Sequence, residues 1–271
     1  MASLKQLRYL PVSHANGGHF VASIAEASAV PSRHAKTRPT FYLWMGIAFC
    51  ALTFFGFYRS FYLNHWFATP PGMRTLTPFF IAHGSLFTLW LMFSVLQPAM
   101  IVRRHRKLHK RIGWFAVGVA ALMVIVGNMA SAEAMNHGFA GLGDRKVFYA
   151  VPFFDMVVFG TCIALAVRWR NHSDWHKRLV LLSYTQILHA GVSRYPFAWL
   201  LPWAPWSFTV WPDLMIILPG VAYDLARRGR VHKVWWLGGG IVLASEPLRV
   251  LIGLTAPWYA FASWIASLWP N

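Results

Sequence analysis

The chain has 271 residues, of which 57% are hydrophobic and only 12% are charged, roughly half the charged share of about 25% in soluble domains. This composition excludes an ordinary water-soluble domain, because too few polar residues are present to cover the apolar ones. The formal net charge of +17 does not indicate a nucleic-acid-binding face, because most lysines and arginines lie in the N-terminal segment and in three loops (103–111, 168–178 and 227–233) that alternate with apolar runs.

The basic segment 103–111 determines the predicted orientation of the chain. It separates two apolar runs, 78–102 and 112–132, each long enough to cross a bilayer, which takes about 20 residues. Loops rich in lysine and arginine remain on the cytoplasmic side of the membrane. The sequence therefore predicts that this loop and the N-terminus are cytoplasmic and that the C-terminus is on the outer side.

An all-α membrane bundle with two flanking segments is predicted. Residues 1–40 are expected to form a flexible cytoplasmic segment. Residues 41–254 are expected to form a membrane domain, and residues 255–271, with three tryptophans, an interfacial aromatic tail. The seven predicted transmembrane helices cover residues 41–63, 78–102, 112–133, 148–167, 179–200, 211–225 and 234–254.

Polar side chains inside these helices are the candidate functional residues, because ionisable groups at membrane depth are costly. A rise of 1.5 Å per residue places them in the outer half of the bundle, where we expect an outward-facing cavity. The alternative is that they only bridge helices through hydrogen bonds and ion pairs. The residues assigned to the cavity are His83, Asn128, Asp155, Gln186, His189, Arg194, Asp213, Glu246 and Arg249.

Histidines occur at two membrane levels. His83 and His189 lie on polar stripes of their helices in the outer half, and they are candidate ligands of a metal or haem iron. His109 and His176 lie at the inner ends of two helices and are a second candidate metal pair, each within an H-x-x-x-H spacing that shares one face of a helix. Two histidines at each level are what two bis-histidine haems would require.

Two motifs carry a resemblance to a known group of proteins. The helix with His83-Gly84, Trp90 and Gln97, followed by the loop Leu108-His109-Lys110-Arg111-x-Gly113, resembles uncharacterised bacterial multi-pass inner-membrane proteins. The likeness extends over about residues 40–255 and implies an inner-membrane location, but no activity. A looser likeness is to transmembrane b-type cytochromes, which use histidines from four helices, whereas the predicted helix 148–167 has none.

Four functional hypotheses follow, from different classes. The first is a cavity that binds a cofactor or small ligand, with haem b for electron transfer as the most concrete candidate and Arg194 and Arg249 as partners for its propionates. The second is a small-solute or proton-coupled transporter, suggested by prolines inside the last two predicted helices. The others are a membrane hydrolase and a non-enzymatic assembly or scaffold subunit. The expected partners are the lipid bilayer and either a small-molecule ligand or other membrane subunits, but not nucleic acid.

Overall fold

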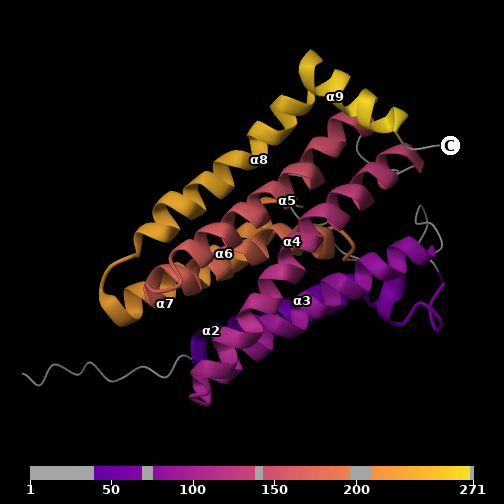
Figure 1. The fold of residues 1–271 in the computed structure, drawn as a ribbon. Helices are drawn as coiled ribbons and strands as arrows, with labels where there is room; N and C mark the ends of the chain where they lie inside the picture. The colour runs from indigo at the N-terminus through magenta and orange to yellow at the C-terminus, as the bar shows by residue number, and fades with distance from the viewer. Residues whose placement is uncertain (1–39, 69–75, 138–142, 196–208, 269–271) are drawn as a thin grey trace, which may run out of the picture. The chain divides into compact units, whose positions relative to one another are not determined.

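The computed structural model describes residues 40–68, 76–137, 143–195 and 209–268 (Figure 1). The chain divides into two units, residues 1–37 and 38–271, and all described residues belong to the second. The predicted flexible segment 1–40 therefore lies almost entirely outside the described residues and stays a prediction.

Helices form all the regular structure of the described residues. η1 is a π-helical continuation of α2, and η4 is a π-helical segment that leads directly into α8. The elements in chain order are α2 (Thr40–Phe57), η1 (Tyr58–Tyr62), α3 (Pro78–Val102), α4 (Arg106–His137), α5 (Arg145–Arg168), α6 (Ser173–Val192), α7 (Val210–Arg228), η4 (Val234–Gly239), α8 (Gly240–Gly253) and α9 (Ala256–Ser267).

Four helical segments of the described residues are long and apolar enough to cross a membrane: α2 with η1, α3, α4 and α5. The pair formed by η4–α8 and α9, which is bent by 77°, makes a fifth if it is counted as one broken span. The prediction of a multi-pass α-helical membrane bundle is confirmed, with four or five candidate spans among the described residues. The seven-span topology stays a prediction, because α6 and α7 are not among the helices long and apolar enough to cross a membrane. The orientation of the termini also stays a prediction.

The predicted helix bounds differ from the structure mainly at the start of α4 and at both ends of α6, which begins at Ser173 and not at residue 179. α4 begins at Arg106 and not at residue 112, because lysine and arginine are good helix formers, so the basic segment is mostly the first turns of a helix. α6 ends at Val192 and not at residue 200. Ser193 and Arg194 form a turn after this end, and Tyr195 precedes a proline, which disfavours the helical region for it. By contrast, α3 has both predicted ends.

α6 is the central helix of the bundle. It packs against α2, α5, α7 and η4, and 13 of its 20 residues are buried, so the polar side chains along it point into protein on nearly every side. The backbones of α2 and α6 are in direct contact, because a Cβ atom added to Gly56 would lie 2.2 Å from the carbonyl oxygen of Gly191. Small residues permit such close approach between membrane helices.

α9 turns away from α8 and docks on the ends of α4 and α5 (Figure 1). Its Trp258 is buried against Tyr149 and Phe153 and donates a 2.8 Å hydrogen bond from Nε1 to the carbonyl oxygen of Lys146. The Lys146 ammonium in turn donates to the Ser263 hydroxyl at 2.9 Å. The segment predicted as an aromatic tail therefore contains a helix with a small hydrophobic core of its own.

Candidate functional site

Six of the nine predicted cavity residues meet in one buried cluster. They come from four helices, and the most exposed of them has only 7% of its surface accessible. We call this group the buried ionic cluster. Its members are Asp155 on α5, Gln186 and His189 on α6, Asp213 on α7, and Glu246 and Arg249 on α8.

Arg249 joins three of the other members. Its Nη1 donates to Asp155 Oδ1 at 2.5 Å, and its Nη2 donates to Gln186 Oε1 at 2.7 Å and to the Ser245 hydroxyl at 2.9 Å. Glu246 Oε1 lies 2.9 Å from Arg249 Nη1, an i,i+3 ion pair within α8. The guanidinium thus ties α8 to α5 and α6.

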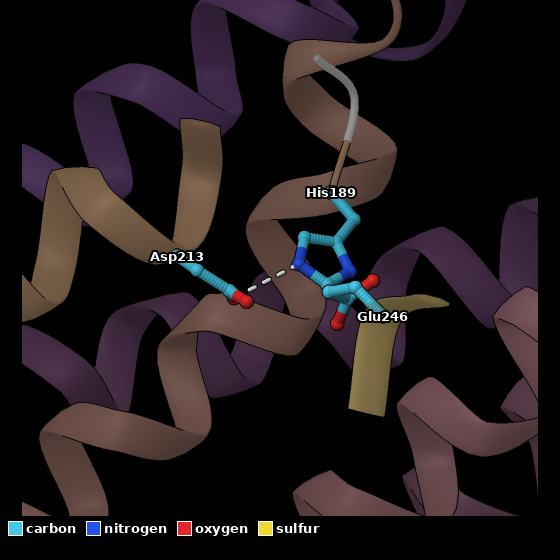
Figure 2. A group of neighbouring side chains, drawn as sticks. All are labelled: His189, Asp213 and Glu246. Carbon is cyan, nitrogen blue, oxygen red and sulfur yellow. Dashed lines mark hydrogen bonds and ion pairs between the residues drawn. The ribbon is translucent and has the colours of Figure 1, made fainter. Parts of the chain in front are cut away.

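His189 lies between two carboxylates. Its Nδ1 is 2.9 Å from Asp155 Oδ1, and its Nε2 is 3.0 Å from Asp213 Oδ1. Figure 2 shows the side chains of Asp213 and Glu246 approaching the His189 ring from different helices. The imidazole therefore links α5, α6 and α7 at one level of the bundle.

Two carboxylates of the cluster have oxygens without a donor. Asp213 Oδ2 and both oxygens of Glu246 are buried and receive no hydrogen bond from the described residues. Three carboxylates carry three negative charges and Arg249 carries one positive charge, so the cluster holds two excess negative charges when His189 is neutral. Ionised groups without a counter-charge are strongly unfavourable in a protein interior.

The other three predicted cavity residues lie elsewhere. His83, on α3, packs against the Phe87 ring with 4.3 Å between centroids, and its buried Nδ1 has no hydrogen-bond partner among the described residues. Asn128 donates to the carbonyl oxygen of Val124 in its own helix at 2.8 Å. Arg194 follows α6 and covers the Phe57 ring at 4.5 Å. In the described part of the chain, no hydrogen bond or ion pair joins these three to the cluster.

The inner histidines meet as a pair from α4 and α6. The rings of His109 and His176 are perpendicular, with centroids 6.2 Å apart. His176 Nδ1 lies 2.9 Å from the carbonyl oxygen of Ala166, and His109 Nδ1 lies 3.4 Å from that of Gln97. The H-x-x-x-H spacing itself does not produce this pairing, because the first histidine of each motif precedes the helix that carries the second.

A buried ion pair near the predicted inner end was missed from the sequence. Arg178 of α6 and Asp224 of α7 are 1% and 0% exposed, and the guanidinium donates twice to the carboxylate, from Nε at 2.9 Å and from Nη2. Asp224 also accepts from the backbone N–H of His232 at 3.2 Å. The available signal was that Asp224 is the one acidic residue in the basic stretch 223–233.

Two groups beside this ion pair have shifted pKa values. Partial burial opposes ionisation of Asp174, but the hydrogen bond and charge of Lys177, with the charge of Arg228, outweigh it and lower the pKa of Asp174 to about 2. Burial, followed by the positive charge of Arg178, lowers the pKa of His232 below its ordinary value. His232 is therefore held in its neutral form against the ion pair.

Comparisons with protein-family models, curated proteins and solved structures find no match for this chain. The function is therefore inferred from the geometry of the buried ionic cluster.

Proposed function

We propose that this chain is a cation-binding carrier of the bacterial inner membrane. In this proposal α6 and α7 complete a bundle of seven spans, with the N-terminus in the cytoplasm and the C-terminus on the outer side. The alternation of basic loops with apolar helices supports this topology. The buried ionic cluster, which the depth argument places in the outer half of the bundle, is the proposed cation site.

The excess negative charge of the cluster is the observation that carries the proposal. Taking an ion out of water into a protein interior costs several kcal/mol unless it is paired. Asp213 and Glu246 are 0% and 2% exposed, and Asp213 Oδ2 and both Glu246 oxygens receive no hydrogen bond from the described residues, although Glu246 Oε1 lies 2.9 Å from Arg249 Nη1. A bound cation would supply the missing positive charge, so the cluster is stabilised by the ion that it binds.

The helices that carry these two carboxylates contain the features expected of moving parts. α7 contains Pro219, and α8 contains Pro247 next to Glu246 and follows the π-helical segment η4. Proline removes a helical hydrogen bond, and broken helices form the ion sites of many carriers. A shift of α7 and α8 against α5 and α6 would open the cluster and release the cation.

The test is cation flux in proteoliposomes. Purified protein is reconstituted with a pH-sensitive dye, or with a metal-sensitive dye, inside the vesicles, and an ion gradient is imposed from outside. We expect flux that depends on the protein and that falls at least tenfold in Glu246→Gln. The matched control is Glu133→Gln, because Glu133 lies at the end of α4 and pairs with His137 at 3.1 Å. Equal flux in both variants would refute the proposal.

A second candidate function is electron transfer through a haem, and the inner histidine pair favours it. Two imidazoles bound to one metal have bonds of about 2 Å each, which is compatible with ring centroids 6.2 Å apart. Hydrogen bonds from Nδ1 to backbone carbonyls are also typical of ligating histidines. We expect a Soret band from protein produced with added haem, lost in His176→Ala but kept in His172→Ala. A colourless protein would remove this candidate.

A further inference from the structure

We propose that His189, Asp213 and Glu246 together bind one divalent transition-metal ion, such as Zn²⁺, Mn²⁺ or Fe²⁺. This inference rests on the proposed cation site and names the class of cation. The three residues come from α6, α7 and α8, and each offers one ligand atom within 4.8 Å of the ligand atoms of the other two (Figure 2).

The donor set selects the class of metal. One imidazole nitrogen and two carboxylates suit first-row divalent ions, whereas Mg²⁺ and Ca²⁺ prefer oxygen ligands alone. Oxygens of Asp213 and Glu246 also point to a bound cation, because no aligned donor satisfies them, although Glu246 Oε1 lies 2.9 Å from Arg249 Nη1. They are buried in the protein, lie close to the His189 ring and receive no hydrogen bond among the described residues.

The contact between His189 Nε2 and Asp213 Oδ1 has the separation of two ligands on one ion. Adjacent ligands with metal bonds of about 2.1 Å lie roughly 3.0–3.4 Å apart, and these two atoms are 3.0 Å apart. Two acceptors at this distance need a positive species between them, which is a proton on Nε2 or a metal ion that both atoms ligate. Metal binding would release that proton to solvent.

The surroundings of His189 match the outer shell of a metal site. Ligating histidines almost always donate their other ring N–H to a carboxylate or carbonyl, which fixes the tautomer. Here Nδ1 lies 2.9 Å from Asp155 Oδ1, and Asp155 is itself held by Arg249 Nη1 at 2.5 Å. Asp155 is therefore a positioning residue that directs the Nε2 lone pair towards Asp213.

The charge of the cluster also matches a divalent ion. With a neutral His189, the three carboxylates and Arg249 leave two excess negative charges. One divalent cation brings this total to zero, whereas one monovalent cation leaves a buried negative charge. Arg249 Nη1 is shared between Asp155 at 2.5 Å and Glu246 at 2.9 Å, so one guanidinium faces two carboxylates, and Asp213 has no contact with it.

The experiment is metal titration of full-length protein in detergent, with any affinity tag cleaved and with bound metal first removed by a chelator. Calorimetry with Zn²⁺ and absorption with Co²⁺ are measured on the wild type, Glu246→Gln, His189→Gln and the control Glu133→Gln. We expect one ion per chain in the wild type and the control, and at least a tenfold loss of affinity in the other two variants. Asp155→Asn should weaken binding about 10–100-fold without changing the number of ions bound.

Several outcomes would overturn the metal assignment. The first is that the wild type binds less than one high-affinity ion per chain. The second is that Glu246→Gln binds the metal as tightly as the wild type, because the ion would then lie outside the buried ionic cluster. Size-exclusion profiles and unfolding in chelator show whether each variant is folded. Glu246-dependent flux of protons or Na⁺ without metal affinity would overturn only this assignment, whereas the absence of both flux and metal binding would overturn the proposed function as well.

Discussion

Arg249→Met is expected to destabilise the protein strongly, whereas Glu246→Gln is not. Arg249 is 1% exposed and donates to Asp155, Gln186 and Ser245. Its removal would add one uncompensated negative charge to the cluster, and breaking a buried ion pair from one side costs about 3–5 kcal/mol. Glu246→Gln removes one negative charge from the cluster and leaves Arg249 paired with Asp155 at 2.5 Å, so the loss of the 2.9 Å contact between Glu246 and Arg249 is offset.

The two substitutions can be compared through the protein's own cysteines. Cys162 is buried and Cys50 is half-buried, and both are free thiols, so a thiol-reactive fluorophore reports unfolding in detergent. For a chain of this size, a loss of 1 kcal/mol in the free energy of unfolding lowers the melting temperature by about 2–4 °C. In the presence of a chelator and at one scan rate, we expect Arg249→Met to melt about 10 °C lower than the wild type, with Glu246→Gln unchanged or higher.

One result would refute this reasoning. If Glu246→Gln lowered the melting temperature as much as Arg249→Met, Glu246 would be a fully paired member of a closed ion-pair network. The excess charge, on which both the cation site and the metal site depend, would then not exist.

Three further predictions concern other parts of the bundle. Asp224→Ala should lower the free energy of unfolding by about 3–5 kcal/mol, because it leaves the buried Arg178 guanidinium unpaired. Trp258→Ala should cost about 3–5 kcal/mol, measured in the same thiol assay, because it leaves a cavity beneath α9. The lowered pKa of His232 means that the unfolded state binds more protons near pH 6.5, so stability should fall as the pH drops through that value.

Each of these has a matched control. Asp174→Ala removes a carboxylate that is 48% exposed and should cost less than about 1 kcal/mol. Trp264→Ala removes a tryptophan of α9 that is 58% exposed, and it should have little effect. His232→Gln should flatten the pH dependence near pH 6.5. An equal loss of unfolding free energy in Trp258→Ala and Trp264→Ala would contradict the prediction for Trp258. An unchanged pH dependence of stability in His232→Gln would contradict the prediction for His232.

Most helices could be predicted from the sequence because the length of an apolar run, and the residues that cap or break a helix, determine its position without reference to the rest of the fold. α3 was predicted to the residue because Thr77 caps its first turn, with the side chain accepting from the Phe80 N–H at 3.3 Å, and because Pro78 starts the helix. α4 and α6 begin six residues before their predicted starts because charged residues form their first turns, and α6 ends before Pro196 and not at residue 200.

The cluster was predicted only as a list of polar residues at one depth. Depth along a helix follows from residue number, but direction around the bundle depends on which helices are neighbours. His83 and His189 were expected as a pair, yet His189 faces α5 and α7 while His83 packs against Phe87. The pairing of Arg178 with Asp224 joins residues 46 positions apart in sequence, and no local pattern indicates it.

The burial of α6 has a consequence for how the protein is made. From Arg178 onwards its ionisable and amide side chains, Arg178, Gln186 and His189, are buried in contact with neighbouring helices. During synthesis these neighbours are incomplete, because α7 and α8 have not yet emerged from the ribosome. Charged and polar residues disfavour release of a single segment from the translocon into lipid. In the proposed seven-span topology we therefore expect α6 to enter the bilayer only together with α7 and α8, so that the buried ionic cluster is assembled as these three helices insert.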